Sequence, residues 1–294
     1  MNQSTSFSFQ PRRSVLYMPG ANQRAMEKAK DLDCDVVVFD LEDAVAPDAK
    51  AQAREQVATA VEGGGYGYRE LVVRCNGLDT PWGEADLARV AQLPIAALLF
   101  PKIEEVNQVE RIVELLAAHG GADKAVWLMI ETPLGVLDVR TFADHPAVQA
   151  LVMGTSDLVK ELRAQHTPSR DNIAMALQQC VLVARLLGKE IFDGVHLDFR
   201  NLETFEQACA GGREMGFDGK TLIHPSQIDL ANQYFGYSVS EVTQARQILA
   251  VWEQALAAGK GVAVLDGQLV ENLHAAEAER VVAWADALNA QNRT

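Results

Sequence analysis

Two acidic residues stand where short apolar segments of the sequence end. Glu131 is the last residue of the segment Val126–Glu131, and Asp157 closely follows the segment Leu151–Thr155. Adjacent strands of a sheet lie about 4.8 Å apart, so the two carboxylates can converge if these segments pair as strands. Two carboxylates, completed by water and substrate oxygens, commonly hold Mg²⁺ in proteins. The alternative is that each acidic side chain caps the helix that follows it.

Arg74 lies within the otherwise apolar segment Leu71–Cys75. A buried arginine is costly unless it is paired with an acid or faces an anion. Arg74 therefore either points at an anionic substrate or forms a salt bridge to Asp40 or Glu42. The acidic residues Glu42 and Asp43 could carry charge at the start of a helix. Alternatively, together with Asp40, they could form a second shell that orients the ligands of a metal.

Basic side chains at other segment ends could contact an anionic substrate. Lys102 follows another apolar segment, where it could bind an anion or pair with an acid of the same sheet. Arg24 and Lys28 would share one face of a short helix near its start, where they could meet phosphates or simply face solvent. His224 precedes a proline, and a structural histidine is commoner in such a place than a general base.

The elements that must position these residues are continuous apolar segments, which are typical of strands buried on both faces of a parallel sheet. Eight such segments alternate with helical patterns, which predicts a (β/α)8 barrel with its functional groups at the carboxyl ends of the strands. An open doubly wound sheet is the alternative, but no GxGxxG or Walker-type loop follows any segment. The predicted strands are Ser14–Met18, Val36–Asp40, Leu71–Cys75, Ala96–Phe100, Val126–Glu131, Leu151–Thr155, Gly194–Leu197 and Thr221–Ile223.

Segments with helical spacing lie between these strands, and the pattern changes from about Ser240 onwards. The segment after that point contains two long helical patterns separated by a glycine-punctuated stretch. We therefore predict a barrel domain over residues 1–238 and a C-terminal helical extension over residues 239–294. The predicted helices are Asn22–Leu32, Glu104–His119, Asn172–Leu187, Glu203–Met215, Glu241–Ala258 and Ala275–Ala287.

Composition limits the class of partner. The 294 residues include 40 acidic and 26 basic side chains, a formal net charge of −14. This balance argues against a nucleic-acid partner but not against an anionic small molecule, which a few arginines in one pocket can bind. The 4 cysteines form no CxxC pair, which favours a reducing compartment. With neither a signal-peptide core nor an apolar run of membrane-spanning length, the sequence predicts a cytoplasmic protein without a membrane partner.

Eight motifs, spread over nearly the whole chain, resemble the citrate lyase β-subunit-like family of the HpcH/HpaI aldolase superfamily. This group of phosphoenolpyruvate-binding (β/α)8 barrels includes malyl-CoA and citramalyl-CoA lyases. The number, order and spacing of the motifs carry the resemblance, and no single motif would suffice. The motifs are RSVLYMPG (13–20), DVVVFDLEDAVAPDAKAQAR (35–54), VVRCNGLDTPWGEADL (72–87), LFPKIE (99–104), IETPLGV (130–136), GTSDLV (154–159), GFDGKTLIHPSQI (216–228) and LDGQLVE (265–271).

The resemblance implies that Glu131 and Asp157 are ligands of Mg²⁺, for which Mn²⁺ can substitute. It places Arg74 in the substrate site. Ile223 and His224 would border that site.

The resemblance also implies contacts with the coenzyme and with a lid. Lys28 matches a position near the coenzyme A part of the substrate. The C-terminal segment of this family forms a lid that can reach a neighbouring subunit and usually presents an aspartate. Glu271 occupies that position here, and its extra methylene group displaces the carboxylate. A homotrimer or a dimer of trimers, with the C-terminal segment as the interface, is the expected assembly.

The activity that the resemblance implies is Mg²⁺-dependent cleavage of citramalyl-CoA or malyl-CoA to acetyl-CoA and pyruvate or glyoxylate. Arg74 would stabilise the enolate, and Glu271 would transfer the proton at the α-carbon. One alternative is the β subunit of citrate lyase, which cleaves a citryl thioester on an acyl carrier protein to give oxaloacetate. Another is a malyl-CoA thioesterase. From a different class, the chain could be a non-catalytic scaffold that retains the barrel.

Overall fold

The computed structural model describes residues 10–291, which fall into two compact units. The barrel unit comprises Arg12–Phe235, and the C-terminal unit comprises residues 236–291 together with residues 10–11. Residues 1–9, part of the segment in which we find no signal-peptide core, lie outside the described residues. Within residues 10–291, no helix is long and apolar enough to cross a membrane.

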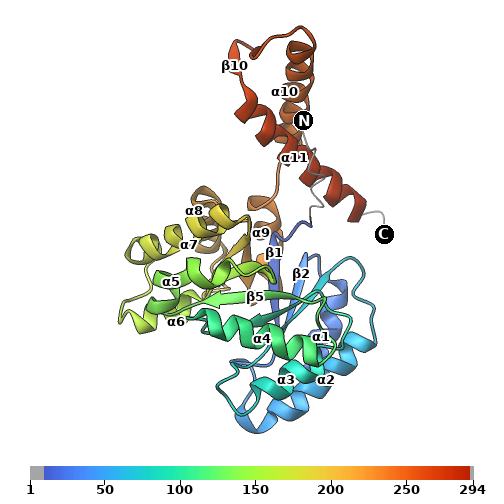
Figure 1. The fold of residues 1–294 in the computed structure, drawn as a ribbon, viewed down its shortest axis with the longest axis vertical. Coiled ribbons are helices and arrows are strands. Elements are labelled where there is room, and N and C mark those ends of the chain that lie inside the picture. Colours follow the sequence, from blue (N-terminus) through green and yellow to red (C-terminus); the bar gives the residue numbers. More distant parts are fainter. Residues whose placement is uncertain (1–9, 292–294) are drawn as a thin grey trace. The chain divides into compact units, whose positions relative to one another are not determined.

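Eight parallel strands close the barrel in chain order, and β1 completes the ring by pairing with β8. The predicted (β/α)8 barrel is therefore confirmed (Figure 1). Most strands begin and end within two residues of the predicted bounds. The strands are β1 (Ser14–Pro19), β2 (Val36–Asp40), β3 (Glu70–Arg74), β4 (Ala97–Phe100), β5 (Ala125–Ile130), β6 (Val148–Met153), β7 (Glu190–Asp193) and β8 (Gly219–Leu222).

The prediction for the seventh strand is wrong. Gly194–Leu197 is irregular and follows β7, which pairs with β6 and β8 through residues 190–193. The apolar part of β7 is limited to Ile191 and Phe192, because an acidic residue stands at each end. Both acids are neutralised by basic residues from distant parts of the chain. Such partners cannot be recognised from a local apolar pattern.

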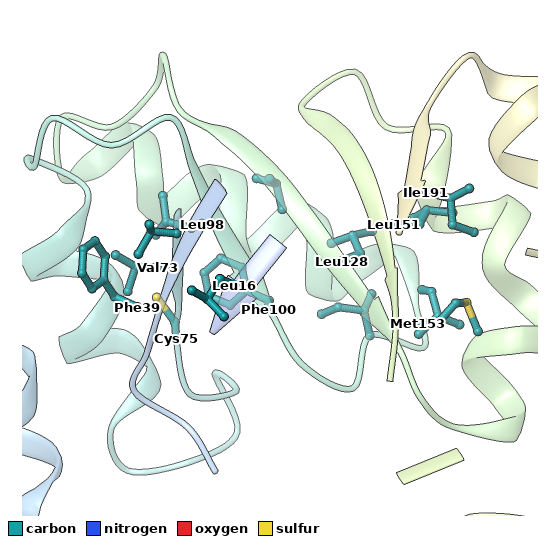
Figure 2. Packing of buried hydrophobic residues seen from close by; sticks show 14 of the residues in the cluster. Leu16, Phe39, Val73, Cys75, Leu98, Phe100, Leu128, Leu151, Met153 and Ile191 are labelled. Carbon is teal, nitrogen blue, oxygen red and sulfur yellow. The ribbon is translucent and has the colours of Figure 1, made fainter. Parts of the chain in front are cut away.

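Alternate residues of the strands form two apolar layers. Val15, Trp127 and Phe192 belong to the cluster inside the barrel. Leu16 and Leu128, each one residue further along its strand, belong to the larger cluster that also includes the inner faces of the helices (Figure 2). The two layers arise because successive side chains of a strand point to opposite faces.

Helices cover the outside of the barrel (Figure 1). The predicted helices that begin at Glu104, Asn172 and Glu203 are confirmed, with differences of one or two residues at their ends. The one predicted at Asn22–Leu32 is an α-helix only as far as Lys28. The helices are α1 (Gln23–Lys28), α2 (Lys50–Glu62), α3 (Gly83–Val90), α4 (Val106–Ala118), α5 (Pro133–Ala143), α6 (Thr155–Glu161), α7 (Ala174–Leu187), α8 (Leu202–Met215) and α9 (Ile228–Tyr234).

The C-terminal unit consists of a helix pair and a β-hairpin. Helices α10 (Val239–Ala257) and α11 (Asn272–Gln291) pack through a small apolar cluster, which confirms both helices predicted here. The hairpin of β9 (Ala263–Leu265) and β10 (Gln268–Val270) was not predicted. Its turn, Asp266–Gly267, has φ angles of 50° and 79°. An Asp-Gly pair favours a tight hairpin turn of this kind, so the signal was present in the sequence.

Candidate active site

A pocket of about 420 Å³ opens at the carboxyl ends of the barrel strands. Strands β1, β3, β5 and β8 contribute lining residues to it, as does helix α6. Basic, acidic and apolar side chains therefore meet in one place, although the sequence scatters them over two hundred residues. The residues of the predicted site that line the pocket are Asp40, Asp43, Arg74, Glu131, Asp157 and Ile223.

Glu131 follows β5 directly and is buried, with 3% of its surface exposed. Its Oε1 accepts a hydrogen bond from the backbone N–H of Lys102 at 3.0 Å. The cap of α5 is Thr132, so the alternative that Glu131 caps a helix is wrong. Burial raises the pKa of Glu131 to about 8, and the nearby carboxylates of Glu42 and Asp157 add to this shift.

Asp157 is the third residue of α6, the helix that follows β6. The helix begins after Gly154 and has no side-chain cap, so the capping alternative is wrong for Asp157 as well. The amines of Lys102 and Lys160 each lie 3.8 Å from the Asp157 carboxylate. Within residues 10–291, no group donates a hydrogen bond to this carboxylate. Its oxygens are therefore available to a cation.

Gly154 permits the close approach of Glu131 to the end of β6. A Cβ atom at position 154 would lie 2.5 Å from the Glu131 Oε2 atom. Real Cβ atoms essentially never approach another atom so closely, so any side chain here would displace Glu131. The glycine thus brings the Glu131 carboxylate to the strand end from which α6 begins.

We expect Gly154→Ala to weaken divalent-cation binding by about tenfold or more. Loss of a group that only orients a metal ligand has an effect of about this size, and displacement of Glu131 itself should have at least as large an effect. Overpacking should also lower the free energy of unfolding by about 1–3 kcal/mol. Calorimetric titration with Mn²⁺ and urea unfolding would measure the two effects. Gly261→Ala is the control, since a Cβ there meets no atom within 4 Å. Unchanged cation affinity in Gly154→Ala would contradict the expectation.

The donor set fits a hard divalent cation. Within residues 10–291, no group of three or more His, Cys, Asp or Glu side chains could hold a metal ion. Glu131 and Asp157 bring two carboxylates to one pocket, and they would hold Mg²⁺ in its usual arrangement, with water and substrate in the other positions. The raised pKa of Glu131 reflects buried negative charge that such a cation would neutralise. Mn²⁺ accepts the same oxygen ligands.

Cation affinity should rise with pH up to about 8. The pKa of Glu131 is raised from 4.5 to about 8, so a cation must displace a proton below that pH, and affinity can rise about tenfold per pH unit. The metal-free fold binds this proton more tightly than the unfolded chain, so its stability should fall as pH rises between those values. Thermal unfolding from pH 5.5 to 8.5, with Mg²⁺ or with a chelator, would measure both trends. Metal-free stability that rises over this range, or a Glu131→Gln variant with the same slope, would contradict the assignment.

Arg74 forms the salt bridge that was one of the two alternatives for its sequence position. Its guanidinium is buried and donates to both carboxylate oxygens of Asp40, at 2.7 and 2.6 Å. It also lies 2.7 Å from a carboxylate oxygen of Glu42. The salt-bridge interpretation is thus confirmed, and the same side chain lines the pocket. The acids hold the guanidinium in a fixed direction, where it can meet a developing negative charge.

The acidic residues after β2 contact Arg74. Helix α2 begins only at Lys50, so the alternative that Glu42 and Asp43 provide charge at a helix start is wrong. Asp40 also accepts hydrogen bonds from the backbone N–H groups of Glu42 and Ala44. Burial raises the pKa of Glu42 to about 7, although Arg74 opposes the shift.

Four residues of the predicted site do not line this pocket. Glu42 contacts Arg74, as described above. Lys28 is exposed at the end of α1. His224 accepts a hydrogen bond from the backbone of Ser226 and stacks on Phe199 at 4.7 Å, as a structural histidine would. Glu271 is exposed at the start of α11 and belongs to the C-terminal unit.

The sequence reasoning missed Tyr17 and Thr221, which line the pocket from β1 and β8. The Tyr17 ring lies 5.0 Å from the Arg74 guanidinium, and burial raises the pKa of its hydroxyl. A tyrosine in an apolar strand is easily interpreted as core. The sequence signal that could have identified both residues is a polar side chain near the carboxyl end of an apolar strand, here β1 and β8.

Comparison with known proteins identifies the family. Residues 13–225 match the model of the HpcH/HpaI aldolase/citrate lyase family. The chain belongs to this family. The match includes every pocket residue described above, and the resemblance noted from the motifs is confirmed. The protein is an enzyme of a lyase family.

Relatives with different activities cover almost all of the chain. A (3S)-malyl-CoA thioesterase of Cereibacter sphaeroides is 45% identical over 280 residues, covering 95% of this chain and 96% of the relative. The L-malyl-CoA/β-methylmalyl-CoA lyase of the same species is 33% identical, with 95% and 96% covered. The citrate lyase β subunit of Escherichia coli is 33% identical, with 88% of each chain covered.

A solved structure agrees with the fold. The CitE protein of Mycobacterium tuberculosis, in complex with magnesium, acetoacetate and coenzyme A, has a TM-score of 0.75 and is 26% identical. The alignment covers 93% of this chain and 97% of that protein.

Proposed function

We propose that this protein is a Mg²⁺-dependent enzyme that acts on malyl-CoA or a closely related 3-hydroxy-dicarboxylyl-CoA thioester, and that it mainly hydrolyses the thioester. The observation that carries the choice of reaction is the 45% identity to a malyl-CoA thioesterase over 95% of the chain, against 33% for the malyl-CoA lyase. The pocket that combines Glu131, Asp157 and Arg74 supports the choice of substrate.

Glu131 and Asp157 would hold the cation together with the hydroxy-acid end of the substrate. When bound, Mg²⁺ supplies Lewis acidity and fixes the orientation of substrate oxygens. Tyr17 and Met129 form part of the pocket wall, which limits the positions of the bound chain. Arg74, held by Asp40, supplies a fixed positive charge in the same pocket.

Hydrolysis requires water to attack the thioester carbonyl carbon. The carbon–sulfur bond then breaks, the coenzyme A thiol leaves with one proton, and the free hydroxy acid retains the oxygen of water. Negative charge develops on the carbonyl oxygen in the transition state, and Arg74 is the preorganised donor suited to stabilise it.

Carbon–carbon cleavage of the same thioester is the second candidate, and the match to an aldolase and lyase family favours it. It would yield acetyl-CoA and a 2-oxo acid. This reaction also needs a group that delivers a proton to the α-carbon, a role predicted for Glu271. The citrate lyase β-subunit reaction would require a carrier-protein thioester instead, and the 33% identity over 88% of the chain gives it less support.

The test uses purified full-length protein with (3S)-malyl-CoA or (S)-citramalyl-CoA, in water enriched in ¹⁸O, with Mg²⁺ or with a chelator. Hydrolysis predicts free coenzyme A and a hydroxy acid that carries one ¹⁸O atom, only with Mg²⁺. Acetyl-CoA with glyoxylate or pyruvate would instead establish the lyase. Failure to convert either thioester would overturn the proposal and direct attention to citryl thioesters on a carrier protein.

Other roles remain predictions that no observation tests. Lys28 would contact the coenzyme A part of the substrate, and His224 would border the site from the turn after β8. The C-terminal unit would form a lid and the interface of a trimer. Replacing Lys28 with glutamine should raise KM for the thioester without changing kcat.

A further inference from the structure

A buried carboxylate at the end of β7 connects three segments of the barrel. Asp193 is fully buried and accepts hydrogen bonds from the Arg170 guanidinium at 2.6 and 2.8 Å. The amine of Lys220, on β8, lies 2.7 Å from the same carboxylate. Asp193 therefore joins the loop after α6, the end of β7 and strand β8. The reaction outlined above uses none of these three residues.

The same charges fix the backbone of Gly194. Its N–H donates to Asp193 at 2.8 Å, and its carbonyl accepts from the Lys220 amine at 2.6 Å. A Cβ at position 194 would lie 2.6 Å from Cγ2 of Thr155 and 2.8 Å from the carbonyl oxygen of Met153. Gly194 thus packs directly against Thr155, the first residue of α6, with no room for a side chain between them.

Arg170 attaches the far end of the same segment. It lies nine residues beyond the last residue of α6, Glu161, and adopts a left-handed backbone conformation with a φ of 58°. This conformation is unfavourable for arginine and persists only where surrounding contacts determine it. The two hydrogen bonds to Asp193 are such contacts. The segment from the start of α6 to Arg170 is therefore connected to the Asp193 carboxylate at both ends. Its first residue packs on Gly194, which is bonded to Asp193, and its last residue, Arg170, is bonded to Asp193 directly.

Asp157 depends on this attachment. Within residues 10–291, the ion-pair partners of its carboxylate are two lysine amines, each at 3.8 Å. Both lysines are largely exposed, at 55% and 74%, so each contact contributes little to orientation. The direction of the Asp157 carboxylate is therefore set by the position of the α6 backbone. Glu131, in contrast, is buried and held by its own hydrogen bond.

We propose that Asp193, together with Arg170 and Lys220, is a positioning residue that sets the geometry of the cation site through Gly194 and α6. The inference rests on the proposed function, because it assumes that Asp157 binds Mg²⁺. It assigns no contact with substrate to Asp193. Its consequence is that cation affinity depends on an ion pair that lies outside the pocket.

A second buried ion pair of the barrel provides a matched control. Asp35 is also fully buried and accepts two hydrogen bonds from the Arg13 guanidinium, both at 2.8 Å. It directly precedes β2, at the amino-terminal end of the barrel and opposite to the pocket. Loss of Arg13 should therefore lower the free energy of unfolding without changing the affinity of the cation site.

The experiment compares Arg170→Gln with Arg13→Gln in the full chain. Calorimetry would measure Mg²⁺ affinity, and urea unfolding would measure stability. We expect Arg170→Gln to weaken Mg²⁺ binding by about 10–100-fold, as does the loss of groups that orient metal ligands. Its kcat should recover at high Mg²⁺ concentration. Arg13→Gln should lose comparable stability but keep its Mg²⁺ affinity within about twofold, and Arg170→Lys should restore part of the affinity.

Equal Mg²⁺ affinity in Arg170→Gln and the unaltered protein would overturn the inference and leave the proposed function intact. A similar loss of affinity in both arginine variants would also overturn it, since the effect would then be general destabilisation. Absence of Mg²⁺ binding to the unaltered protein would overturn the proposed function, and the inference with it. If Arg170→Gln does not fold, Arg170→Lys replaces it, with a severalfold loss of affinity expected against an Arg13→Lys control.

Discussion

Glu131→Gln is expected to reduce kcat/KM by about three orders of magnitude while leaving the fold at least as stable at pH 8. The amide keeps the size of the side chain and an oxygen to accept from the Lys102 N–H. It lacks the negative charge that a Mg²⁺ ligand supplies. Loss of the cation removes several kcal/mol of transition-state stabilisation, and each 1.36 kcal/mol is about tenfold in rate.

Stability separates this effect from misfolding. The raised pKa of Glu131 means that the ionised side chain is unfavourable in the metal-free fold, so a neutral amide removes a cost at alkaline pH. Glu190→Gln is the control, because Glu190 is a half-buried glutamate, with a pKa raised to about 7, at the opposite end of the barrel. It should retain most of the activity. Initial-rate kinetics, Mg²⁺ titration and thermal unfolding at pH 8 would compare the two variants. A Glu131→Gln protein with Mg²⁺-dependent activity near that of the unaltered protein would contradict the metal assignment.

Most of the barrel was predictable because seven of its eight strands have a local signature. Continuous apolar segments are sufficient to identify strands buried on both faces, and seven of the predicted segments overlap the observed strands. The exception, β7, has two apolar residues between acids whose partners come from β8 and from the chain before β1. The hairpin of the C-terminal unit was missed for another reason. Its Asp-Gly turn is a local signal, but each flanking strand has only 3 residues, too few for a strand pattern.

The candidate site was predictable where a charged residue directly follows an apolar segment, as with Glu131 and Arg74. It was not predictable where function depends on pairing over a distance. Arg170, in a left-handed backbone conformation, meets Asp193 across 23 positions of sequence. Local patterns also cannot show that position 154 must be glycine because a larger side chain would clash with Glu131. These contacts depend on tertiary packing, which is fixed only when the barrel closes.

Arg74→Lys is expected to lower kcat by about 100–1,000-fold while leaving Mg²⁺ affinity nearly unchanged. Lysine keeps the positive charge, but it cannot donate to both oxygens of Asp40 and contact Glu42 at the same time. The charge would then lose its fixed direction, and removal of one preorganised donor costs about 10²–10³ in kcat. Steady-state kinetics at saturating Mg²⁺, together with calorimetric Mg²⁺ titration, would measure this separation.

The contrast with Glu131→Gln distinguishes the roles of the two residues. The glutamate variant should lose cation binding and activity together, whereas Arg74→Lys should lose activity with the cation still bound. Arg54→Lys is the matched control, because Arg54 donates to the fully buried Asp86 at 2.7 Å outside the pocket. It should retain activity despite a similar chemical change. If Arg74→Lys weakened Mg²⁺ binding as much as Glu131→Gln does, Arg74 would act by supporting the cation site, and stabilisation of the carbonyl oxygen would have to come from another group.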